Sequence, residues 1–166
     1  MIELRPLTDS DIDAHNAGED EAAVRWLTGG HATRDSTRRH FAQLSENAAR
    51  GQGKRGFGVW LDDRLAGYVD FDPDADNLPS ADDVNIAYAV HPWARRRGVA
   101  TTAVLLVCKH ITNEGLASRA LIRADPLNTG SVGVATRCGF QLIIEPGPTE
   151  PHATYAMNLH GHNQDR

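Results

Sequence analysis

The sequence has little of what marks secreted, membrane-spanning and metal-binding proteins. It contains two cysteines, Cys108 and Cys138, and their spacing matches no zinc motif. Two isolated thiols suit a reducing compartment, and both are expected to be buried packing residues. No apolar run approaches the roughly 20 residues of a membrane span, and no apolar signal region opens the chain. These absences predict a cytoplasmic protein that neither binds a metal nor contacts a membrane.

A basic surface and the common nucleotide-binding loops are also missing. The formal net charge is -5, which argues against a nucleic-acid partner because phosphates repel an acidic surface. Neither Gly-Lys-Ser/Thr nor Gly-x-Gly-x-x-Gly occurs, which disfavours a nucleotide-binding α/β protein. A chain of 166 residues with 40% hydrophobic residues fits one globular domain. We expect that domain at residues 1–160, with a polar tail at 161–166.

The pattern of residues 84–113 predicts a strand, a basic loop and a helix. Apolar side chains alternate from Val84 to Val90, as in a half-buried strand, and Pro92 ends the alternation. From Val99 onward apolar residues recur at helical spacing. The first N–H groups of a helix carry partial positive charge, so the junction predicts an anion site. An arginine-rich turn alone is often only a solvated surface, but the flanking strand and helix favour the anion site.

Two motifs in this region resemble those of a known family. Arg95-x-x-Gly98-x-Ala100 resembles the acetyl-CoA signature of the GCN5-related N-acetyltransferases (GNAT), Arg/Gln-x-x-Gly-x-Gly/Ala. Asn128-x-x-Ser131 followed by Gly139-Phe140 resembles the second family block. The order of elements is most similar to the branch of the ribosomal-protein N-terminal acetyltransferases. The resemblance implies the GNAT acyl-CoA N-acyltransferase fold, an α+β fold whose mixed, mostly antiparallel central sheet is flanked by helices.

The resemblance also implies acetyl-CoA as the cosubstrate. In the family the loop amides bind the coenzyme A pyrophosphate. The preceding strand splays from its neighbour and binds the pantetheine arm, and one of its amides, near Ala89 or Val90 in this sequence, stabilises the oxyanion. Carried over to this sequence, the cofactor-binding residues are Ala89, Val90, Arg95, Arg96, Arg97, Gly98, Val99, Ala100, Thr101, Asn128 and Ser131. The family's early helices wall the acceptor pocket, which makes Trp26, His31 and Asp35 candidate substrate-binding residues, although each type is more often a packing or surface residue.

The sequence departs from the family at both catalytic positions. The usual general base, a Glu, is replaced by Asn85, and an amide cannot accept a proton at neutral pH. Asp83, two residues earlier on the same strand face, is the predicted base, acting through a water held by Asn85. The usual acid, a Tyr, is replaced by Ala135, which leaves Ser131 as the predicted acid. The alternative that Ser131 only binds or packs near the coenzyme stays open.

The polar segment from Asp70 to Asp83 has three interpretations. It is rich in aspartates, and a solvated loop is the default. Carboxylates at the mouth of the central strand would also attract a cationic amine. A calcium loop is a third interpretation, although the Gly and terminal Glu of an EF-hand are missing.

Two functions from different classes fit these observations. The first is an acetyl-CoA-dependent N-acetyltransferase that acts on a primary amine: a protein N-terminus, a polyamine or an amine-bearing antibiotic. The second is a degenerate acyl-CoA-binding domain without turnover, suggested by the missing Glu and Tyr. A homodimer paired through the C-terminal hairpin is compatible with the fold.

The two functions differ in one measurable result. Both predict coenzyme binding at residues 95–101. Only the enzyme predicts amine-dependent release of free coenzyme A from acetyl-CoA, weakened by Asp83→Ala or Ser131→Ala. Unchanged turnover in both variants would show that these two catalytic predictions are wrong.

Overall fold

A computed structural model describes residues 1–160, apart from the side chains of Leu27 and Thr28. The predicted polar tail at 161–166 lies outside the described residues. One seven-stranded sheet runs through the molecule, in the order β1-β2-β3-β4-β5-β7-β6. The strands are β1 (Ile2–Arg5), β2 (Arg55–Leu61), β3 (Arg64–Asp72), β4 (Asp83–Val90), β5 (Arg119–Ala124), β6 (Gln141–Ile144) and β7 (Ala153–Asn158). All neighbouring pairs are antiparallel except β4 and β5, which confirms the predicted mixed sheet.

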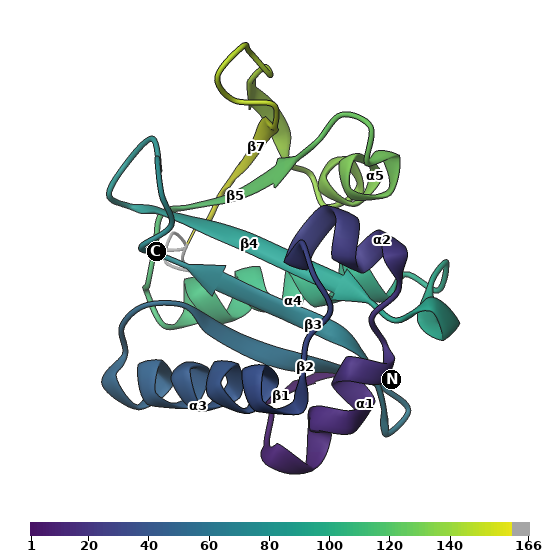
Figure 1. Cartoon of the computed structure of the whole chain (residues 1–166). Coiled ribbons are helices and arrows are strands. Elements are labelled where there is room, and N and C mark those ends of the chain that lie inside the picture. Colours follow the sequence, from purple (N-terminus) through teal and green to yellow (C-terminus); the bar gives the residue numbers. More distant parts are fainter. Residues whose placement is uncertain (161–166) are drawn as a thin grey trace.

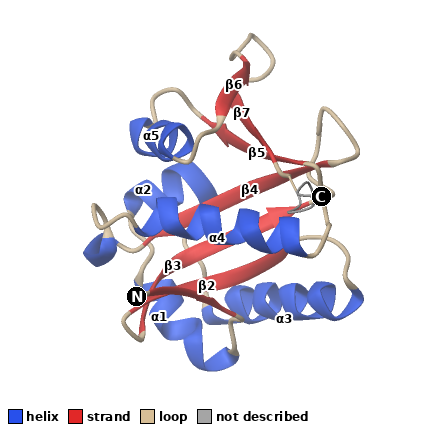
Figure 2. Ribbon diagram, turned by 180° about the vertical axis from the view of Figure 1, so that it is seen from behind, coloured by secondary structure: helices blue, strands red, loops and turns tan. Residues whose placement is uncertain are grey.

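Helices cover both faces of the sheet (Figures 1 and 2). On one face lie α1 (Ile12–Ala17), α2 (Glu21–Ala23), its π-helical continuation Val24–Thr28, and α3 (Arg34–Arg50). The opposite face carries α4 (Val99–Asn113), while α5 (Thr129–Arg137) lies beside β5. Short 3-10 turns span Asp9–Asp11 and Pro92–Ala94. No helix within residues 1–160 is both long and apolar enough to cross a membrane.

Local sequence signals explain where these elements begin and end. The α3 helix begins after Thr33, whose hydroxyl accepts a hydrogen bond from the Ser36 amide. The turn between β2 and β3 is formed by Asp62 and Asp63, both with positive φ, which suits a tight hairpin. The α4 helix has the predicted bounds because its apolar stripe, which includes Val104 and Val107, is fully buried against the sheet.

The parallel pairing of β4 with β5 is short. Only three residue pairs join the strands, from Asp83↔Arg119 to Asn85↔Leu121. Beyond Asn85 the strands diverge, while β4 stays paired with β3 and β5 with β7. The β4 strand therefore has a free edge facing β5 over its second half, the splay that the family resemblance implies.

The β3–β4 ladder determines which amides face this free edge. The His91 amide donates to the Ala66 carbonyl at 2.7 Å. Since N–H directions alternate along an antiparallel ladder, the Ala89 amide also points toward β3 and the Val90 amide points away from it. Of the two predicted oxyanion donors, Val90 is the one whose N–H faces the gap between β4 and β5.

Gly67 allows β3 and β4 to approach closely at this point, and we expect Gly67→Ala to destabilise the protein. A Cβ at Gly67 would lie 2.3 Å from the Ala89 carbonyl oxygen, so the backbone must shift. The free energy of unfolding should fall by about 1–3 kcal/mol or more, as measured by urea denaturation. Gly130→Ala is the control. Gly130 lies in α5, and a Cβ added there would be 3.7 Å from its nearest neighbour, the Asn128 Oδ1, which is ordinary van der Waals contact. Equal unfolding midpoints for the two variants would contradict this account.

Candidate active site

Two cavities of similar size meet at β4. The α1–α3 cavity, of about 510 Å³, lies between those helices and the centre of the sheet. The β4–β5 cleft, of about 500 Å³, follows the gap where these strands diverge. Ala23, Ala87 and Ala89 line both. Because the shared residues have only methyl side chains, the boundary between the cavities is thin.

The loop at the end of the β4–β5 cleft suits an anion. Arg96 and Gly98 have φ values of 61° and 73°, which turn the chain sharply into α4. No described atom outside the immediate chain neighbours lies within 4 Å of a Cβ built on Gly98, so the N-terminus of α4 is open to a ligand. The first amides of α4 have no partner within the helix and carry partial positive charge. Arg96 and Arg137 add full charges at the cleft wall, and a pyrophosphate group fits this arrangement.

Most of the predicted cofactor-binding residues line this cleft. They are Ala89, Val90, Arg95, Arg96, Gly98, Val99, Ala100, Thr101, Asn128 and Ser131. Arg97 lies outside the lining, with its guanidinium 5.9 Å from the centre of the Trp93 ring. The free edge of β4, the open helix N-terminus and the cationic wall together fit an extended anionic molecule such as coenzyme A.

Arg95 holds the loop in place. Its two terminal nitrogens donate to the Asp20 carboxylate at 2.6 and 2.9 Å, and its Nε donates to the Val90 carbonyl at 3.1 Å. These hydrogen bonds lower the pKa of Asp20 to about 2. Asp20 also caps α2 by accepting from the Ala23 amide. Arg95 therefore fixes α2 against the loop. Both Arg95 and Arg96 line the cleft, but only the guanidinium of Arg95 is engaged by Asp20 and Val90, so Arg96 is the better placed of the two to bind a ligand.

A pair of hydroxyl groups lies across the cleft from this loop. Asn128 caps α5 by accepting a hydrogen bond from the Ser131 amide at 3.2 Å. The Ser131 Oγ lies 2.7 Å from the Tyr88 hydroxyl. Burial raises the pKa of Tyr88 to about 12, so this hydroxyl stays protonated at neutral pH. The sequence pattern identified Tyr88 only as a strand residue, because its pairing depends on how α5 approaches β4.

Asp83 does not fit the role of general base. Its carboxylate is 2% exposed and accepts from Arg119 Nε and Nη2, each at 2.8 Å, and from the Ser80 amide at 2.9 Å. The Arg119 hydrogen bonds lower the pKa of Asp83. Both oxygens are occupied, and the residue lies outside the lining of both cavities, where β4 is still closed by β5. The prediction is corrected: Asp83 is a structural ion-pair residue.

Asn85 does line the β4–β5 cleft. Its buried Oδ1 has no hydrogen-bond partner among the described residues. A buried acceptor without a partner is costly, so this oxygen is available to a ligand N–H or to a water. The predicted role as an anchor for water therefore has a suitable atom in place.

The three predicted acceptor residues lie in different places. His31 lines the α1–α3 cavity, with its Nδ1 3.7 Å from the Glu19 carboxylate. Trp26 lines the β4–β5 cleft instead. Asp35 is exposed on α3, where it accepts a hydrogen bond from Arg38. Asp35 lies outside the lining of both cavities, so its prediction as a substrate contact does not fit.

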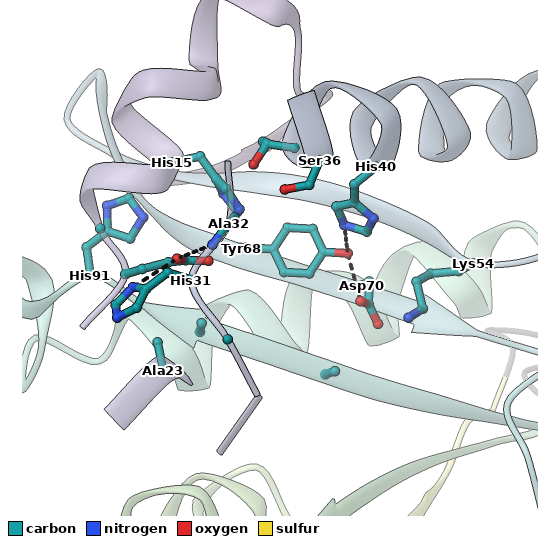
Figure 3. A pocket seen from close by; sticks show the side chains of 16 residues that line it. His15, Ala23, His31, Ala32, Ser36, His40, Lys54, Tyr68, Asp70 and His91 are labelled. Carbon is teal, nitrogen blue, oxygen red and sulfur yellow. Dashed lines mark hydrogen bonds and ion pairs between the residues drawn. The ribbon is translucent and has the colours of Figure 1, made fainter. Parts of the chain in front are cut away.

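The α1–α3 cavity contains titratable residues that the sequence analysis did not select (Figure 3). Figure 3 shows the Tyr68 hydroxyl between the His40 ring and the Asp70 carboxylate, with Lys54 beside Asp70. Three further cavity residues, His15, His91 and Glu19, come from α1, from the end of β4 and from the turn after α1. Burial lowers the pKa of His15 to about 4 and also lowers those of His40 and His91, which keeps all three neutral. No local motif marks these residues, because they come from five separate segments: α1 with the turn after it, α3, the loop before β2, β3 and the end of β4.

The acidic loop before β4 is tied into the fold, and both cysteines are buried packing residues. Arg123 donates to the Asp76 and Asn77 carbonyls, which ties the loop before β4 to β5. Within residues 1–160 no group of three His, Cys, Asp or Glu side chains is arranged to hold a metal ion.

Cys108 and Cys138 are buried and unbonded to each other, and burial raises the pKa of Cys108 to about 12. Its thiol is therefore protonated at neutral pH and suits packing.

Comparison with known families and structures agrees with this geometry. Residues 2–141 match the family described as Acetyltransferase (GNAT) domain. A comparison with curated proteins finds no match. Among solved structures, the aminoglycoside acetyltransferase AAC(6')-Ib in complex with coenzyme A is 15% identical with a TM-score of 0.78, and the match covers 95% of each chain.

Two ribosomal-protein acetyltransferases are similarly close in structure. RimL in complex with coenzyme A is 20% identical with a TM-score of 0.78, covering 95% of this chain and 94% of that one. An acetyltransferase from Salmonella typhimurium that modifies the N-terminal serine of a 50S ribosomal subunit protein is 21% identical with a TM-score of 0.75, at the same coverage. The TM-scores show that the fold is shared, and at identities this low the likeness shows the fold alone.

The Asp83–Arg119 pair yields a test that separates stability from catalysis. Asp83→Asn leaves Arg119 with a weakened partner at the closed end of the β4–β5 pairing. The loss in free energy of unfolding should lie near the lower end of about 3–5 kcal/mol, since Arg119 keeps partial contact with water. The folded fraction should keep its kcat, measured below the melting temperature. The double variant Asp83→Leu with Arg119→Met should recover part of the lost stability. A large loss of kcat in an Asp83→Asn protein that stays folded would contradict this account and support Asp83 as the general base.

Proposed function

This chain belongs to the GNAT acetyltransferase family, and on that premise we propose that its β4–β5 cleft binds acetyl-CoA and its α1–α3 cavity binds the acceptor amine. The observation that carries the proposal is the meeting of the two cavities at Ala87 and Ala89. An amine in one cavity can reach an acyl group in the other across these small side chains. This arrangement favours direct transfer, without an acyl-enzyme step.

The cleft residues have separate tasks in this reaction. Acetyl-CoA supplies an acetyl group activated as a thioester. The N-terminal amides of α4 and the Arg96 guanidinium bind its pyrophosphate, and the free edge of β4 binds the pantetheine arm. The Val90 N–H faces the cleft and donates to the carbonyl oxygen as negative charge develops there. Asn85 Oδ1 holds a water or an amide N–H of the ligand.

The Ser131 and Tyr88 hydroxyls act as the acid. Their oxygens are 2.7 Å apart, so either can donate to the departing sulfur and be reprotonated by the other. Tyr88 thus supplies from β4 the phenol that the family commonly places at the position of Ala135. The missing Tyr was one of the two arguments for a degenerate binding domain, beside the missing Glu, and Tyr88 weakens it.

The α1–α3 cavity supports a compact cationic acceptor. The carboxylates of Glu19 and Asp70 line it together with Lys54, and burial keeps His15, His40 and His91 neutral. About 510 Å³ accommodates the first residues of a protein N-terminus or a small amine. AAC(6')-Ib is an aminoglycoside acetyltransferase and RimL is a ribosomal-protein one, so both acceptor classes belong in the test.

We also propose a domain organisation, a cellular location and an oligomeric state for the protein. One sheet through residues 1–160 supports a single domain. Two unpaired, buried thiols support a cytoplasmic location. A homodimer through the edge strand β6 is supported by Leu142, Ile143 and Ile144, which are 46%, 42% and 43% exposed.

Release of free coenzyme A tests the function directly. The assay uses acetyl-CoA with a short peptide bearing a free N-terminus, spermidine and kanamycin, with blanks for the protein's own thiols. Turnover with one amine is expected. Ser131→Ala combined with Tyr88→Phe should lower kcat by about 100-fold or more, and each single change by less because the hydroxyls substitute for one another. Coenzyme binding by calorimetry without any turnover would support the degenerate binder, and absence of binding would refute both.

Arg96 and Arg97 form a matched pair for the pyrophosphate site. Both are exposed loop arginines, but only Arg96 lines the cleft. Arg96→Ala should raise the KM for acetyl-CoA by about tenfold, the loss of one charge-assisted contact. Arg97→Ala should leave KM nearly unchanged. A larger rise in the KM for acetyl-CoA in Arg97→Ala than in Arg96→Ala would show that the loop binds the phosphates in a different way.

A further inference from the structure

Asp70 is a buried carboxylate that the packing of the protein does not explain. Its side chain lies on β3 and is 3% exposed. Oδ2 accepts a hydrogen bond from the Tyr68 hydroxyl at 2.7 Å, while Oδ1 has no partner among the described residues. Burying a carboxylate oxygen without a hydrogen-bond partner is costly. A group kept in this state is a candidate for a functional role.

The position of Asp70 places this carboxylate beside the point of transfer. Asp70 is the direct cross-strand partner of Ala87 on β4. Their side chains are on the same face, and neighbouring strands lie about 4.8 Å apart. Ala87 lines both cavities, and Asp70 lines the acceptor side. The methyl group of Ala87 leaves the space between Asp70 and the cleft open.

We propose that Asp70 is the general base of the transfer, taking the proton of the acceptor amine at Oδ1, in place of the Glu that Asn85 replaces. This inference rests on the acetyl transfer proposed above. The ammonium form of the acceptor first loses one proton to solvent, which leaves a neutral amine. As its nitrogen bonds to the acetyl carbon, the C–S bond breaks and the sulfur takes the electron pair. The sulfur receives a proton from the Ser131–Tyr88 pair, and the nitrogen loses one to Asp70. Solvent then restores both groups, so protons and electrons balance.

Tyr68 is the positioning residue for this base. Its hydroxyl donates to Asp70 Oδ2 and lies 3.2 Å from His40 Nε2 (Figure 3). Held at one oxygen, the carboxylate leaves the other for the acceptor. Gly56 permits this arrangement, because a Cβ there would come within 2.9 Å of the Tyr68 hydroxyl.

The charged groups around Asp70 give the base a suitable proton affinity. Burial raises the pKa of Asp70 to about 6, against the opposing effects of Lys54 and the Tyr68 hydrogen bond. Asp72 on the same strand raises it further. Two neutral histidines also face the Tyr68–Asp70 pair, His40 from α3 and His15 from α1. A carboxyl group that titrates near neutrality is a better base than an ordinary aspartate and is still ionised at pH 7.

The other titratable groups of the cavity are less suitable as the base. Glu19 already accepts from the Ala32 amide and faces His31. His15 has an unpartnered Nδ1, but its pKa of about 4 makes it a weaker base than Asp70. Lys54 acts on Asp70 as a positive charge that lowers the pKa of that carboxyl, so it is not a candidate base.

The experiment compares Asp70→Asn with Asp82→Asn, an exposed aspartate outside both cavities. Release of coenzyme A is followed from about pH 5 to 8 with whichever of the peptide, spermidine or kanamycin turns over. Asp70→Asn should lower kcat by about 100-fold or more, with unchanged acetyl-CoA binding by calorimetry, and should remove the inflection near pH 6. Asp82→Asn should match the wild type. Activity of Asp70→Asn within about threefold of the wild type, with the inflection retained, would overturn the proposal and leave the acetyltransferase function intact.

Tyr68→Phe provides a second variant in case Asp70→Asn does not fold. Loss of the hydrogen bond that lowers the pKa of Asp70 should move the inflection to higher pH. A purely structural role for Tyr68 would change the amount of folded protein and leave the inflection in place, and that result would also overturn the proposal. If the wild type releases no coenzyme A with any amine, the proposed function fails and this inference fails with it.

Discussion

The divergence of β4 from β5 is the constraint on which the rest of the molecule depends. Only three residue pairs join the two strands, and the buried Asp83–Arg119 ion pair holds them at the closed end. Beyond Asn85, β4 is bonded only to β3. One strand therefore has one edge in the sheet and one edge free for a ligand. Both cavities depend on that strand, so a change that closes or widens the split would alter both cavities together.

The two sides of β4 differ in their electrostatics. On the cleft side, an open helix N-terminus and the Arg96 and Arg137 side chains attract a polyanion. On the helix side, burial keeps His15, His40 and His91 neutral, and the Glu19 and Asp70 carboxylates can attract an ammonium ion. Asp70 has a folded-state pKa above its unfolded value. Its contribution to stability is therefore favourable at low pH and is lost as the pH rises from about 4 to 6, which is the expected trade-off for a base held in a dry site.

Arg95 shows why a motif residue does not keep one fixed role. The family signature includes this arginine in the coenzyme loop, and it does line the cleft. Its hydrogen-bonding groups, however, contact Asp20 and the Val90 carbonyl. Through Asp20 it anchors α2, whose Ala23 lies at the boundary of the two cavities. The same residue therefore links the shape of the coenzyme loop to the wall of the acceptor site.

The sequence by itself determined the features that arise from neighbours along the chain. Alternation over Val84–Val90 and the helical stripe after Val99 predicted the strand and the helix, because each pattern repeats within one element. The anion site at Gly98 stays a prediction. The catalytic residues were less predictable. Asp83 shares a strand face with Asn85, yet Arg119 of β5 occupies its carboxylate. Only the tertiary structure decided that Asp70 lies beside Ala87 and that Tyr88 meets Ser131. Those pairings depend on the register between strands and on how α5 packs, and these are set by contacts between segments far apart in the sequence.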